Sequence, residues 1–268
     1  MMDIQYDNIY LGDCMQLMRD IPDNSIDCII CDLPYGVLNK RNPEAQWDRT
    51  PPLDELFSHY RRITKPESPV ILFAQGMFTA QLMMAQPKFW KYNIIWDKVQ
   101  KTGFLNANRQ PLRKHEDILV FYDKMPTYNP QMIKCAPHQR NHHRGKDHDR
   151  GITNSCYGKF HNVPVVISDE KFPTSIISIT KEHKTGHFFH PTQKPVELLR
   201  WLIRTYTNPE DVILDNCMGS GTTCVAAVME ERHFIGMELA EKYFNIAHQR
   251  IQKAINDKNN TSSINLFT

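Results

Sequence analysis

The sequence predicts an α/β fold in which a mostly parallel, doubly wound sheet carries helices on both of its faces. Short runs of apolar residues alternate along the chain with longer segments whose apolar residues recur at helical spacing. Several apolar runs end directly at an acidic residue, and open α/β sheets bind their ligands at such carboxyl ends. A polar and basic stretch between 123 and 190 interrupts the alternation, so we expect a small loop-rich insertion there.

Strands and helices alternate regularly in the first half of the chain. The apolar run 26–31 is continuous, as expected for a strand buried on both faces, and it ends at Asp32. Pro22 stops the helix that precedes this strand. The strands expected here are 9–11, 26–31, 70–74, 92–96 and 118–122, and the helices are 14–20, 53–63 and 77–85.

The same alternation returns after the polar stretch. Pro195, a residue type well suited to the first helical turn, opens an amphipathic helix. The two strands that follow end at Asp215 and Glu238. The elements expected here are helices 196–206, 222–231 and 243–255 and strands 212–214 and 234–237, followed from 256 by a polar, frayed tail.

Composition limits the classes of protein to which the chain can belong. Of its 268 residues, 41% are hydrophobic, which suffices for a large core, and the formal net charge of +2 neither requires nor excludes nucleic acid. No apolar run approaches the roughly 18 residues of a membrane span and no signal peptide is recognised, so we expect a cytoplasmic protein. Cys28 and Cys31 form a C-x-x-C inside an apolar strand, and we interpret them as core residues rather than metal ligands.

A glycine-rich turn near the C-terminus predicts a nucleotide-type pocket. Gly219 and Gly221 follow the strand that ends at Asp215 and lead into a helix, which allows the backbone to approach a ligand closely. Glu238 ends the next strand, where an acidic residue can accept hydrogen bonds from both ribose hydroxyls. Cys224 replaces the third glycine of a dinucleotide fingerprint. These residues favour an adenosine-containing cofactor without separating NAD from S-adenosylmethionine, and a turn with no ligand is the alternative.

The pentapeptide Asp32-Leu33-Pro34-Tyr35-Gly36 predicts a site for a planar ring that carries an amino group. The carboxylate of Asp32 and the carbonyl of Leu33, whose backbone Pro34 restricts, can accept two hydrogen bonds, and Tyr35 can stack on the ring. An extruded nucleobase with an exocyclic amino group needs these partners. The alternative is an ordinary turn in which Tyr35 packs in the core.

Together, the pentapeptide and the glycine-rich turn resemble the motifs of the amino-methylating DNA methyltransferases, (D/N/S)-P-P-(Y/F) and a loop similar to D-P-F-x-G-S-G-T-T. The catalytic motif precedes the cofactor motif, which resembles the circularly permuted β group of this superfamily. Leu33 replaces the first proline of the catalytic signature, and Asn216-Cys217 replaces the Pro-Phe of the cofactor loop. Further segments that resemble motifs of the family are 11–14, 95–98, 102–107, 115–122 and 190–195.

The resemblance implies a Rossmann-like, doubly wound mixed sheet of the S-adenosylmethionine-dependent methyltransferase type, circularly permuted, with a small inserted recognition lobe. It implies S-adenosylmethionine rather than NAD as the cofactor, and it assigns catalysis to Asp32, Leu33, Pro34 and Tyr35. The residues expected to bind the cofactor are Asp13, Asp32, Gln193, Lys194, Asp215, Gly219, Gly221, Thr222 and Glu238. Among them, Asp13 is expected near the adenine, Glu238 on the ribose and Lys194 at the carboxylate.

The order of these motifs divides the chain into functional parts. We expect a catalytic part over 1–123, a target-recognition lobe over 124–189, a cofactor-binding part of the same domain over 190–256 and a flexible tail over 257–268. The lobe is rich in basic residues and histidines without zinc-site spacing, so we interpret it as a DNA-facing surface. The candidate DNA contacts in it are Arg140, Arg144, Lys146 and Arg150.

The sequence thus predicts a site-specific methyltransferase that modifies the N6 amino group of adenine in double-stranded DNA after base flipping. Asp32 favours adenine, because serine is typical of this position in the cytosine enzymes of the family; N4 of cytosine is the alternative. The other readings are methylation of an RNA base or a protein glutamine, a non-catalytic DNA-binding module and a dinucleotide oxidoreductase. We expect a monomer or homodimer, with a cognate restriction enzyme as a candidate partner.

Overall fold

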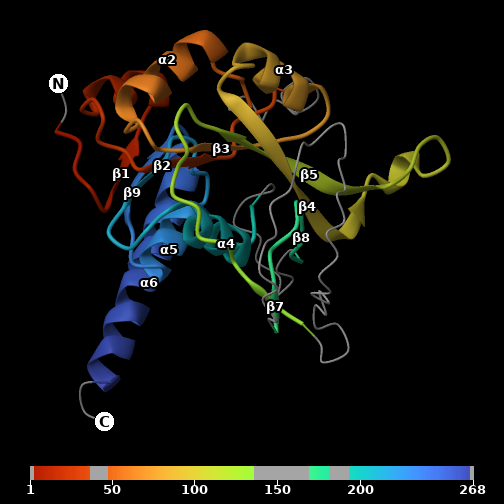
Figure 1. Cartoon of the computed structure of the whole chain (residues 1–268). Coiled ribbons are helices and arrows are strands. Elements are labelled where there is room, and N and C mark those ends of the chain that lie inside the picture. Colours follow the sequence, from red (N-terminus) through yellow and green to blue (C-terminus); the bar gives the residue numbers. More distant parts are fainter. Residues whose placement is uncertain (1–2, 37–47, 136–168, 181–192, 266–268) are drawn as a thin grey trace, which may run out of the picture. The chain divides into compact units, whose positions relative to one another are not determined.

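The computed structural model describes residues 3–36, 48–135, 169–180 and 193–265, which fall into two compact units. One unit comprises Met1–Asn129 and Ser175–Thr268, and the other comprises Pro130–Thr174. In the second unit, β6 (Ile133–Lys134) and β7 (Glu170–Lys171) form an antiparallel pair. The first unit holds the main sheet and its helices (Figure 1), and the account of the site concerns this unit alone.

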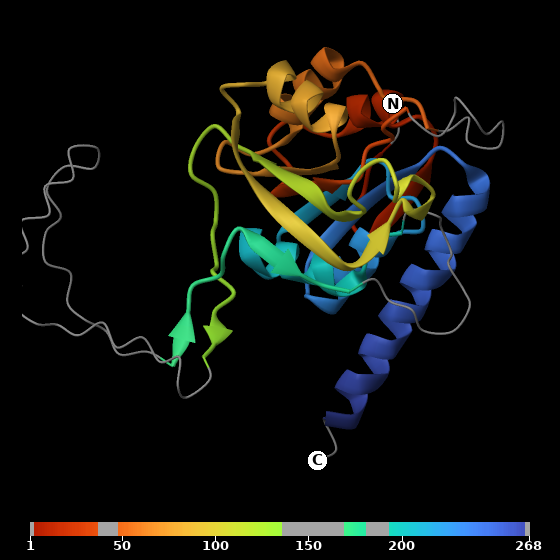
Figure 2. The same ribbon diagram turned by 90° about the vertical axis from the view of Figure 1, so that its right-hand side faces the viewer.

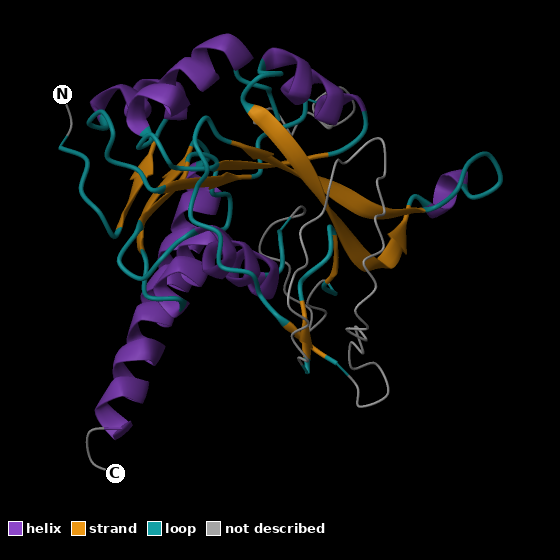
Figure 3. Cartoon of the chain, viewed as in Figure 1, coloured by secondary structure: helices purple, strands orange, loops and turns teal. Residues whose placement is uncertain are grey.

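An eight-stranded sheet forms the centre of the first unit (Figure 3). Its strands are β1 (Asn8–Leu11), β2 (Cys28–Cys31), β3 (Val70–Ala74), β4 (Trp90–Thr102), β5 (Arg113–Phe121), β8 (Ile176–Ser178), β9 (Val212–Asp215) and β10 (His233–Glu238). They lie in the order β1-β10-β9-β2-β3-β5-β4-β8. The first five run parallel to one another, whereas β5 is antiparallel to both β3 and β4.

Helices cover both faces of this sheet (Figure 2). They are α1 (Cys14–Leu17), which continues as the 3₁₀ turn Met18–Asp20, α2 (Leu53–Ile63), α3 (Met77–Ala85), α4 (Val196–Tyr206), α5 (Thr222–Met229) and α6 (Glu241–Asn265). Side chains of α1, α2 and α3 pack into the core on one face, and those of α4, α5 and α6 pack into the core on the other. Among the helices described, none is long and apolar enough to cross a membrane.

The side chains of β2 alternate between the two cores. Cys28 and Ile30 join the core under α4, α5 and α6, whereas Ile29 and Cys31 join the core under α1, α2 and α3. All four side chains are fully buried. The two thiols of the C-x-x-C therefore point to opposite faces of the sheet and cannot share a metal ion or form a disulfide. Their interpretation as core residues is confirmed.

Hydrophobic periodicity predicted several element boundaries well, and α2 illustrates why. Its buried residues Leu56, Phe57, Tyr60 and Ile63 recur at helical spacing and form one face. Acidic residues occupy its first turn and arginines its last turn, where each charge interacts favourably with the helix dipole. The elements β3, α2, α3 and α4 begin and end at the residues expected from the sequence.

The largest departures from the expectation involve four elements. β4 and β5 extend beyond 92–96 and 118–122 into a long hairpin whose polar outer part carries no apolar pattern. The interpretation of 123–190 as lying outside the sheet is wrong at β8, which pairs with β4 and is too short to show a pattern. The expected tail from 257 is helical up to Asn265, because helix propagation adds a hydrogen bond per residue even in polar sequence.

Candidate active site

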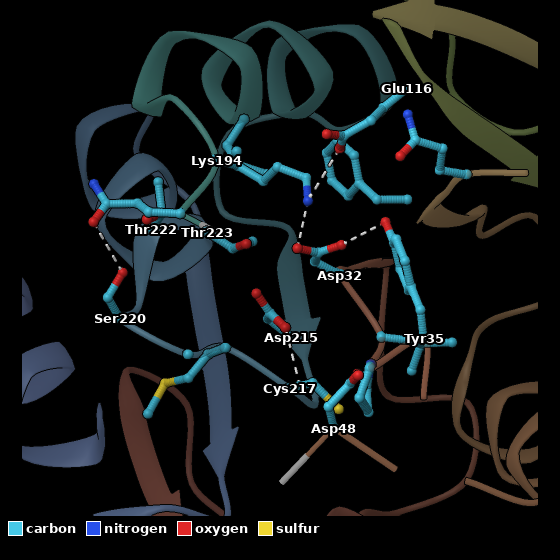
Figure 4. Close-up of a pocket in the computed structure, with 18 of the residues that line it drawn as sticks. Asp32, Tyr35, Asp48, Glu116, Lys194, Asp215, Cys217, Ser220, Thr222 and Thr223 are labelled. Atoms are coloured by element: carbon cyan, nitrogen blue, oxygen red, sulfur yellow. Dashed lines mark hydrogen bonds and ion pairs between the residues drawn. The ribbon is translucent and has the colours of Figure 1, made fainter. Parts of the chain in front are cut away.

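Two motifs that are far apart in sequence meet at the carboxyl edge of the sheet. β2 and β9 are parallel neighbours, with Ile29 opposite Leu214, so that Asp32 and Asp215 both emerge at the same edge. A cleft of about 350 Å³ opens there, and residues of both motifs line it (Figure 4). The predicted site residues that line this cleft are Asp32, Leu33, Pro34, Tyr35, Gln193, Lys194, Asp215, Gly219, Thr222 and Glu238.

Two side chains from the segment before α2 hold the turn that follows β2. The buried carboxylate of Asp48 accepts a hydrogen bond of 3.0 Å from the backbone N–H of Gly36. The hydroxyl of Thr50 donates a hydrogen bond of 3.0 Å to the carbonyl of Pro34. Gly36 has a φ of +71°, a backbone conformation that glycine adopts without strain. These contacts fix the turn so that the carboxylate and the aromatic ring of the motif line the cleft.

Tyr35 connects the motif to α3 and to its own aspartate. Its hydroxyl donates a hydrogen bond of 3.0 Å to Asp32 Oδ1, and its ring packs on Phe78 with centroids 4.9 Å apart and planes tilted by 31°. Burial, together with the negative charges of Asp32 and Glu116, raises the pKa of Tyr35 well above its ordinary value, so the hydroxyl remains a donor. Phe78 therefore supports the Tyr35 ring, which also borders the cleft.

Lys194 lies in a chain of alternating charges that begins at the catalytic motif. Its ammonium forms an ion pair with Asp32 Oδ2 and lies 3.4 Å from Glu116 Oε2 (Figure 4). Glu116 Oε1 lies in turn 3.1 Å from the Nζ atom of Lys98. The Lys194 Nζ atom also lies 4.8 Å from the centroid of the Phe73 ring, within reach of a cation–π contact. The sequence suggests a cofactor carboxylate as the partner of Lys194, whereas in the structure two protein carboxylates share its charge.

Burial and charge together set the protonation of this chain of groups. Burial raises the pKa of Asp32; the ammonium of Lys194 opposes this effect, while the negative charge of Glu116 adds to it. Burial alone would lower the pKa of Lys194, but attraction to Asp32 and Glu116 outweighs it, and the pKa lies above its ordinary value. Lys194 is therefore cationic at neutral pH and favours the carboxylate form of Asp32.

Asp215 occupies the cofactor side of the cleft. Its Oδ1 atom accepts a hydrogen bond of 3.1 Å from the backbone N–H of Cys217. Burial raises the pKa of Asp215 to about 7, the hydrogen bonds from Thr223 and from the Cys217 N–H oppose this rise, and the charge of Asp32 adds to it. A cationic group in the cleft would favour its carboxylate form, so this side of the cleft suits a positively charged ligand.

Glu238 orders the glycine-rich loop. Its carboxylate accepts hydrogen bonds from the backbone N–H groups of Gly219, at 2.9 Å, and Ala240, at 2.8 Å. The Ser220 hydroxyl donates a hydrogen bond of 3.3 Å to Gln193 Oε1, which ties the loop to the segment before α4. The residue expected to bind ribose therefore lines the cleft and also holds the main chain of the loop in place.

Two residues expected to contact a cofactor do not line the cleft. Asp13 caps α1 and accepts a hydrogen bond of 2.8 Å from the backbone N–H of Met15. Gly221 caps α5 with a φ of +74°, and a Cβ atom added to it would lie 2.9 Å from the Cβ atom of Ala247 in α6. The absence of a side chain at Gly221 therefore permits the close packing of α5 against α6.

We expect Gly221→Ala to lower the free energy of unfolding by about 2 kcal/mol or more, because the new methyl group meets α6 as well as adopting a left-handed backbone. Gly103→Ala is the matched control, since Gly103 has similar dihedral angles of +87° and 28° but no atom closer than 3.9 Å to the added Cβ. Gly103→Ala should lower the free energy of unfolding by only about 1–2 kcal/mol, the cost of a left-handed backbone at alanine. Urea denaturation measures both variants, and equal losses would contradict the packing role of Gly221.

Asn216 and Cys217 replace the Pro-Phe of the family's cofactor loop with a buried polar network. Asn216 accepts a hydrogen bond of 2.7 Å from the hydroxyl of Tyr60, and its amide nitrogen lies 3.6 Å from the sulfur atoms of Cys14 and Cys217. Cys217 lines the cleft. At this position the loop presents a thiol to the cleft where the family signature has an aromatic ring.

Some residues of the site were not found from the sequence, and some predicted residues are not described. Asp48, Lys98 and Glu116 line the cleft, yet none of them was among the predicted site residues, and the sequence offered no motif for Asp48. Lys98 and Glu116 lie in the family-like segments 95–98 and 115–122, and the acidic pair Glu116-Asp117 before an apolar run was a further signal. The candidate DNA contacts lie outside the described residues; they are Arg140, Arg144, Lys146 and Arg150.

The fold and the cleft define the class of the protein, the α/β methyltransferases that use S-adenosylmethionine. A family model described as DNA methylase, for the enzymes that modify N6 or N4 amino groups, matches residues 26–249. The chain therefore belongs to the N6/N4 DNA methylase family.

Relatives and solved structures are similar over nearly the whole chain. The type II methyltransferase M.BglII of Bacillus subtilis is 26% identical over 279 residues, which cover 94% of this chain and 71% of that protein. The type II methyltransferase M.HinfI of Haemophilus influenzae is 28% identical over 293 residues, with 97% and 71% covered. The sequence-based assignment to the amino-methylating DNA methyltransferases is confirmed.

Two solved structures share the fold. The complex of M1.HpyAVI with S-adenosylmethionine has a TM-score of 0.60 at 23% identity and covers 91% of this chain and 98% of its own. The cytosine-N4-specific PvuII DNA methyltransferase has a TM-score of 0.65 at 16% identity, with 93% and 91% covered. These structures confirm the predicted Rossmann-like fold class. The predicted cofactor, S-adenosylmethionine, is confirmed by membership of the DNA methylase family.

Proposed function

We propose that this DNA methyltransferase modifies the N6 amino group of adenine at a specific sequence in double-stranded DNA, after the target base has left the duplex. The observation that carries the proposal is the single cleft lined by both the Asp32–Tyr35 turn and the glycine-rich loop. Two acceptors and an aromatic ring suit an extruded base with an amino group. Asp32 favours adenine through the resemblance of its motif, and N4 of cytosine is the alternative.

The residues of the cleft fit S-adenosylmethionine. When bound, this cofactor supplies an electrophilic methyl group on a positively charged sulfur. The carboxylates of Asp215 and Glu238 are buried at the cleft wall, and both complement a ligand that carries a cation and ribose hydroxyls. We assign Glu238 to the ribose and Asp215 with Gly219 to the methionyl part, with Gln193 and Thr222 beside them.

Positioning and charge account for the proposed catalysis. Asp32 and the carbonyl of Leu33 accept hydrogen bonds from the amino group of the base, while Tyr35 supports its ring. These acceptors keep the nitrogen lone pair available, and the carboxylate stabilises the positive charge that develops on the nitrogen. Asp32 then accepts the proton that the nitrogen loses. The reaction requires no cysteine nucleophile.

We further assign positioning roles to Lys194 and Glu116. The ammonium of Lys194 holds Asp32 as a carboxylate and fixes its orientation, and Glu116 holds Lys194 from the opposite side. A buried carboxylate without this partner would be protonated more readily and would lose one of its acceptor oxygens. The pair thus keeps the proposed catalytic group in the state that binds an amino group.

The remaining parts of the proposal concern DNA, partners and compartment. We assign target recognition to the basic stretch within 124–189, through Arg140, Arg144, Lys146 and Arg150, with phosphate contacts that weaken as salt increases. The relatives are named type II methyltransferases, which supports a role in restriction–modification with a cognate restriction enzyme. We propose a cytoplasmic monomer or homodimer.

Long-read sequencing of methylated DNA tests the function and the base together. The chain is expressed in a bacterial strain that lacks its own DNA methylation, and Asp32→Ala is expressed in parallel. We expect N6-methyladenine at nearly every copy of one short sequence in the first strain and none in the second. N4-methylcytosine at such a sequence would assign the alternative base, and unmodified DNA would overturn the proposal.

Calorimetry with S-adenosylmethionine separates this enzyme from a non-catalytic DNA-binding module. We expect one binding site per chain and competition by S-adenosylhomocysteine, the product that methyl transfer leaves behind. Binding of DNA without any heat from the cofactor would favour the non-catalytic module.

A further inference from the structure

The hairpin between β4 and β5 ends in an exposed apolar tip. Phe104 and Leu105, on the 3₁₀ turn η3 (Phe104–Asn106), are 77% and 84% exposed, more than any other large hydrophobic side chain in the described part of the chain. The tip projects from the sheet of the first unit (Figure 1). Both side chains lie outside the two cores that stabilise this unit.

Hydrogen bonds order this tip. The backbone N–H groups of Asn106, Ala107 and Arg109 donate to the carbonyls of Gly103, Phe104 and Asn106 at 3.0, 3.1 and 2.9 Å. Gly103 adopts a φ of +87°, which allows the turn to begin directly after β4. The exposure of the two apolar side chains is therefore built into a hydrogen-bonded turn.

The charges around the tip have one sign. Residues 100–114 contain Lys101, Arg109, Arg113 and Lys114 and no acidic residue. Lys101 and Arg109 are exposed on the two sides of the apolar pair in sequence. Apolar side chains flanked by cations complement a polyanion that also offers apolar stacking surfaces, which is the chemistry of a nucleic acid.

The neck of the hairpin borders the cleft. Thr102 and Arg113 are paired at the ends of β4 and β5, and both line the cleft together with Asp32. The guanidinium of Arg113 donates a hydrogen bond of 3.1 Å to Gln75, which also lines the cleft. A duplex that delivers a base into this cleft must therefore lie close to the hairpin.

We propose that the tip of the hairpin enters duplex DNA beside the extruded base, with Phe104 or Leu105 filling the gap in the base stack and Lys101 and Arg109 contacting neighbouring phosphates. DNA-bending proteins insert apolar side chains as wedges between base steps. The gap left by an extruded base lies between the apolar faces of its neighbours, so it suits an apolar side chain. This inference rests on the proposed function and assigns part of its DNA surface to described residues.

Two double variants test the inference against two matched controls. Phe104→Ala with Leu105→Ala is expected to lower kcat/KM for unmethylated plasmid DNA about tenfold or more. The alanines no longer fill the gap in the base stack, and the stacking of the Phe104 ring on a neighbouring base is lost. Its Kd for S-adenosylmethionine and its Tm should match those of the wild type, because neither side chain lies in a core or in the cleft. Met84→Ala with Met229→Ala removes two other exposed apolar side chains, and its kcat/KM should stay at the wild-type value.

The charge variant is Lys101→Gln with Arg109→Gln, and Lys88→Gln with Lys253→Gln is its control. The quantity measured is the slope of a plot of log DNA affinity against log salt concentration. Its magnitude should fall by about two in the first pair and stay unchanged in the second, since each lost phosphate contact means about one fewer counterion released on binding. Unchanged kcat/KM in the apolar variant and an unchanged salt slope in the charge variant would overturn the inference. A loss of mass by light scattering in the apolar variant would overturn it too, by assigning the tip to a second copy of the chain.

DNA binding and methylation by the wild-type protein distinguish failure of the hairpin inference from failure of the proposed function. A wild type that binds duplex DNA but does not methylate it refutes the proposed function, and the salt slopes then still decide whether the hairpin contacts DNA. A wild type that methylates plasmid DNA supports the function whatever the hairpin variants do.

Discussion

Replacing Asp32 by alanine is expected to lower kcat for methyl transfer to DNA by about 10³-fold or more while changing the Kd for S-adenosylmethionine little. The carboxylate is proposed to bind the amino group and to stabilise the charge that develops on its nitrogen, and alanine does neither. Lys194 keeps a counterion in this variant because Glu116 lies 3.4 Å away, so the variant should fold. Transfer of a labelled methyl group to plasmid DNA and calorimetry with the cofactor measure the two quantities.

Asp32→Asn and Asp123→Asn control this prediction. Asp32→Asn retains the size of the side chain but presents an NH₂ group beside the amino group of the base, so it should be nearly as inactive as alanine. Asp123 pairs with Arg61 outside the cleft, at 2.7 Å, and its replacement by asparagine should leave kcat unchanged. Near-normal transfer by Asp32→Ala would exclude Asp32 from catalysis and with it the assignment of the Asp32–Tyr35 turn.

Local patterns in the sequence were sufficient for much of the fold. Apolar residues at helical spacing gave α2 and α4 their boundaries, and a continuous apolar run gave β3 its boundaries, because burial against the sheet requires those periods. The outer parts of β4 and β5 were missed because backbone pairing, rather than an apolar face, maintains them there. β8 was missed because three residues are too few for a pattern, although Ile177 is buried in the core.

The candidate site was predictable only where a motif is contiguous. Asp32 and Tyr35 stand in one pentapeptide, and Gly219 stands in one turn, so each could be singled out from sequence neighbours. The ion pair between Asp32 and Lys194 joins residues 162 positions apart, and no local pattern encodes it. The packing constraint on Gly221 was missed for a related reason, since it comes from a helix later in the chain.

Removing the charge of Lys194 should make methyl transfer more sensitive to acid. The ammonium opposes the effect of burial on the pKa of Asp32, so Lys194→Met raises that pKa further. The proposed role of Asp32 in transfer requires its carboxylate form, which is lost as pH falls through the pKa. The acid limb of the kcat profile should therefore move to higher pH in the variant. We expect kcat at pH 7 to fall about tenfold or more and to recover in alkaline buffer.

Two further variants fix the sign of this effect. Lys194→Arg keeps the positive charge and should keep the acid limb near that of the wild type. Glu116→Gln removes a negative charge that raises the pKa of Asp32, so its acid limb should move to lower pH. The other groups that face Asp32 remain in all three variants, namely Tyr35, which donates to it, and Asp215 across the cleft.

The same variants separate a positioning role for Lys194 from a role in holding the cofactor. If Lys194 bound the carboxylate of S-adenosylmethionine, Lys194→Met would raise the Kd of the cofactor and leave the pH profile of kcat in place. The ion pair with Asp32 instead predicts a displaced profile and a nearly constant Kd, because the Lys194 ammonium is shared by Asp32 and Glu116. A profile that stays in place in Lys194→Met would therefore show that the protonation of Asp32 does not depend on this ion pair.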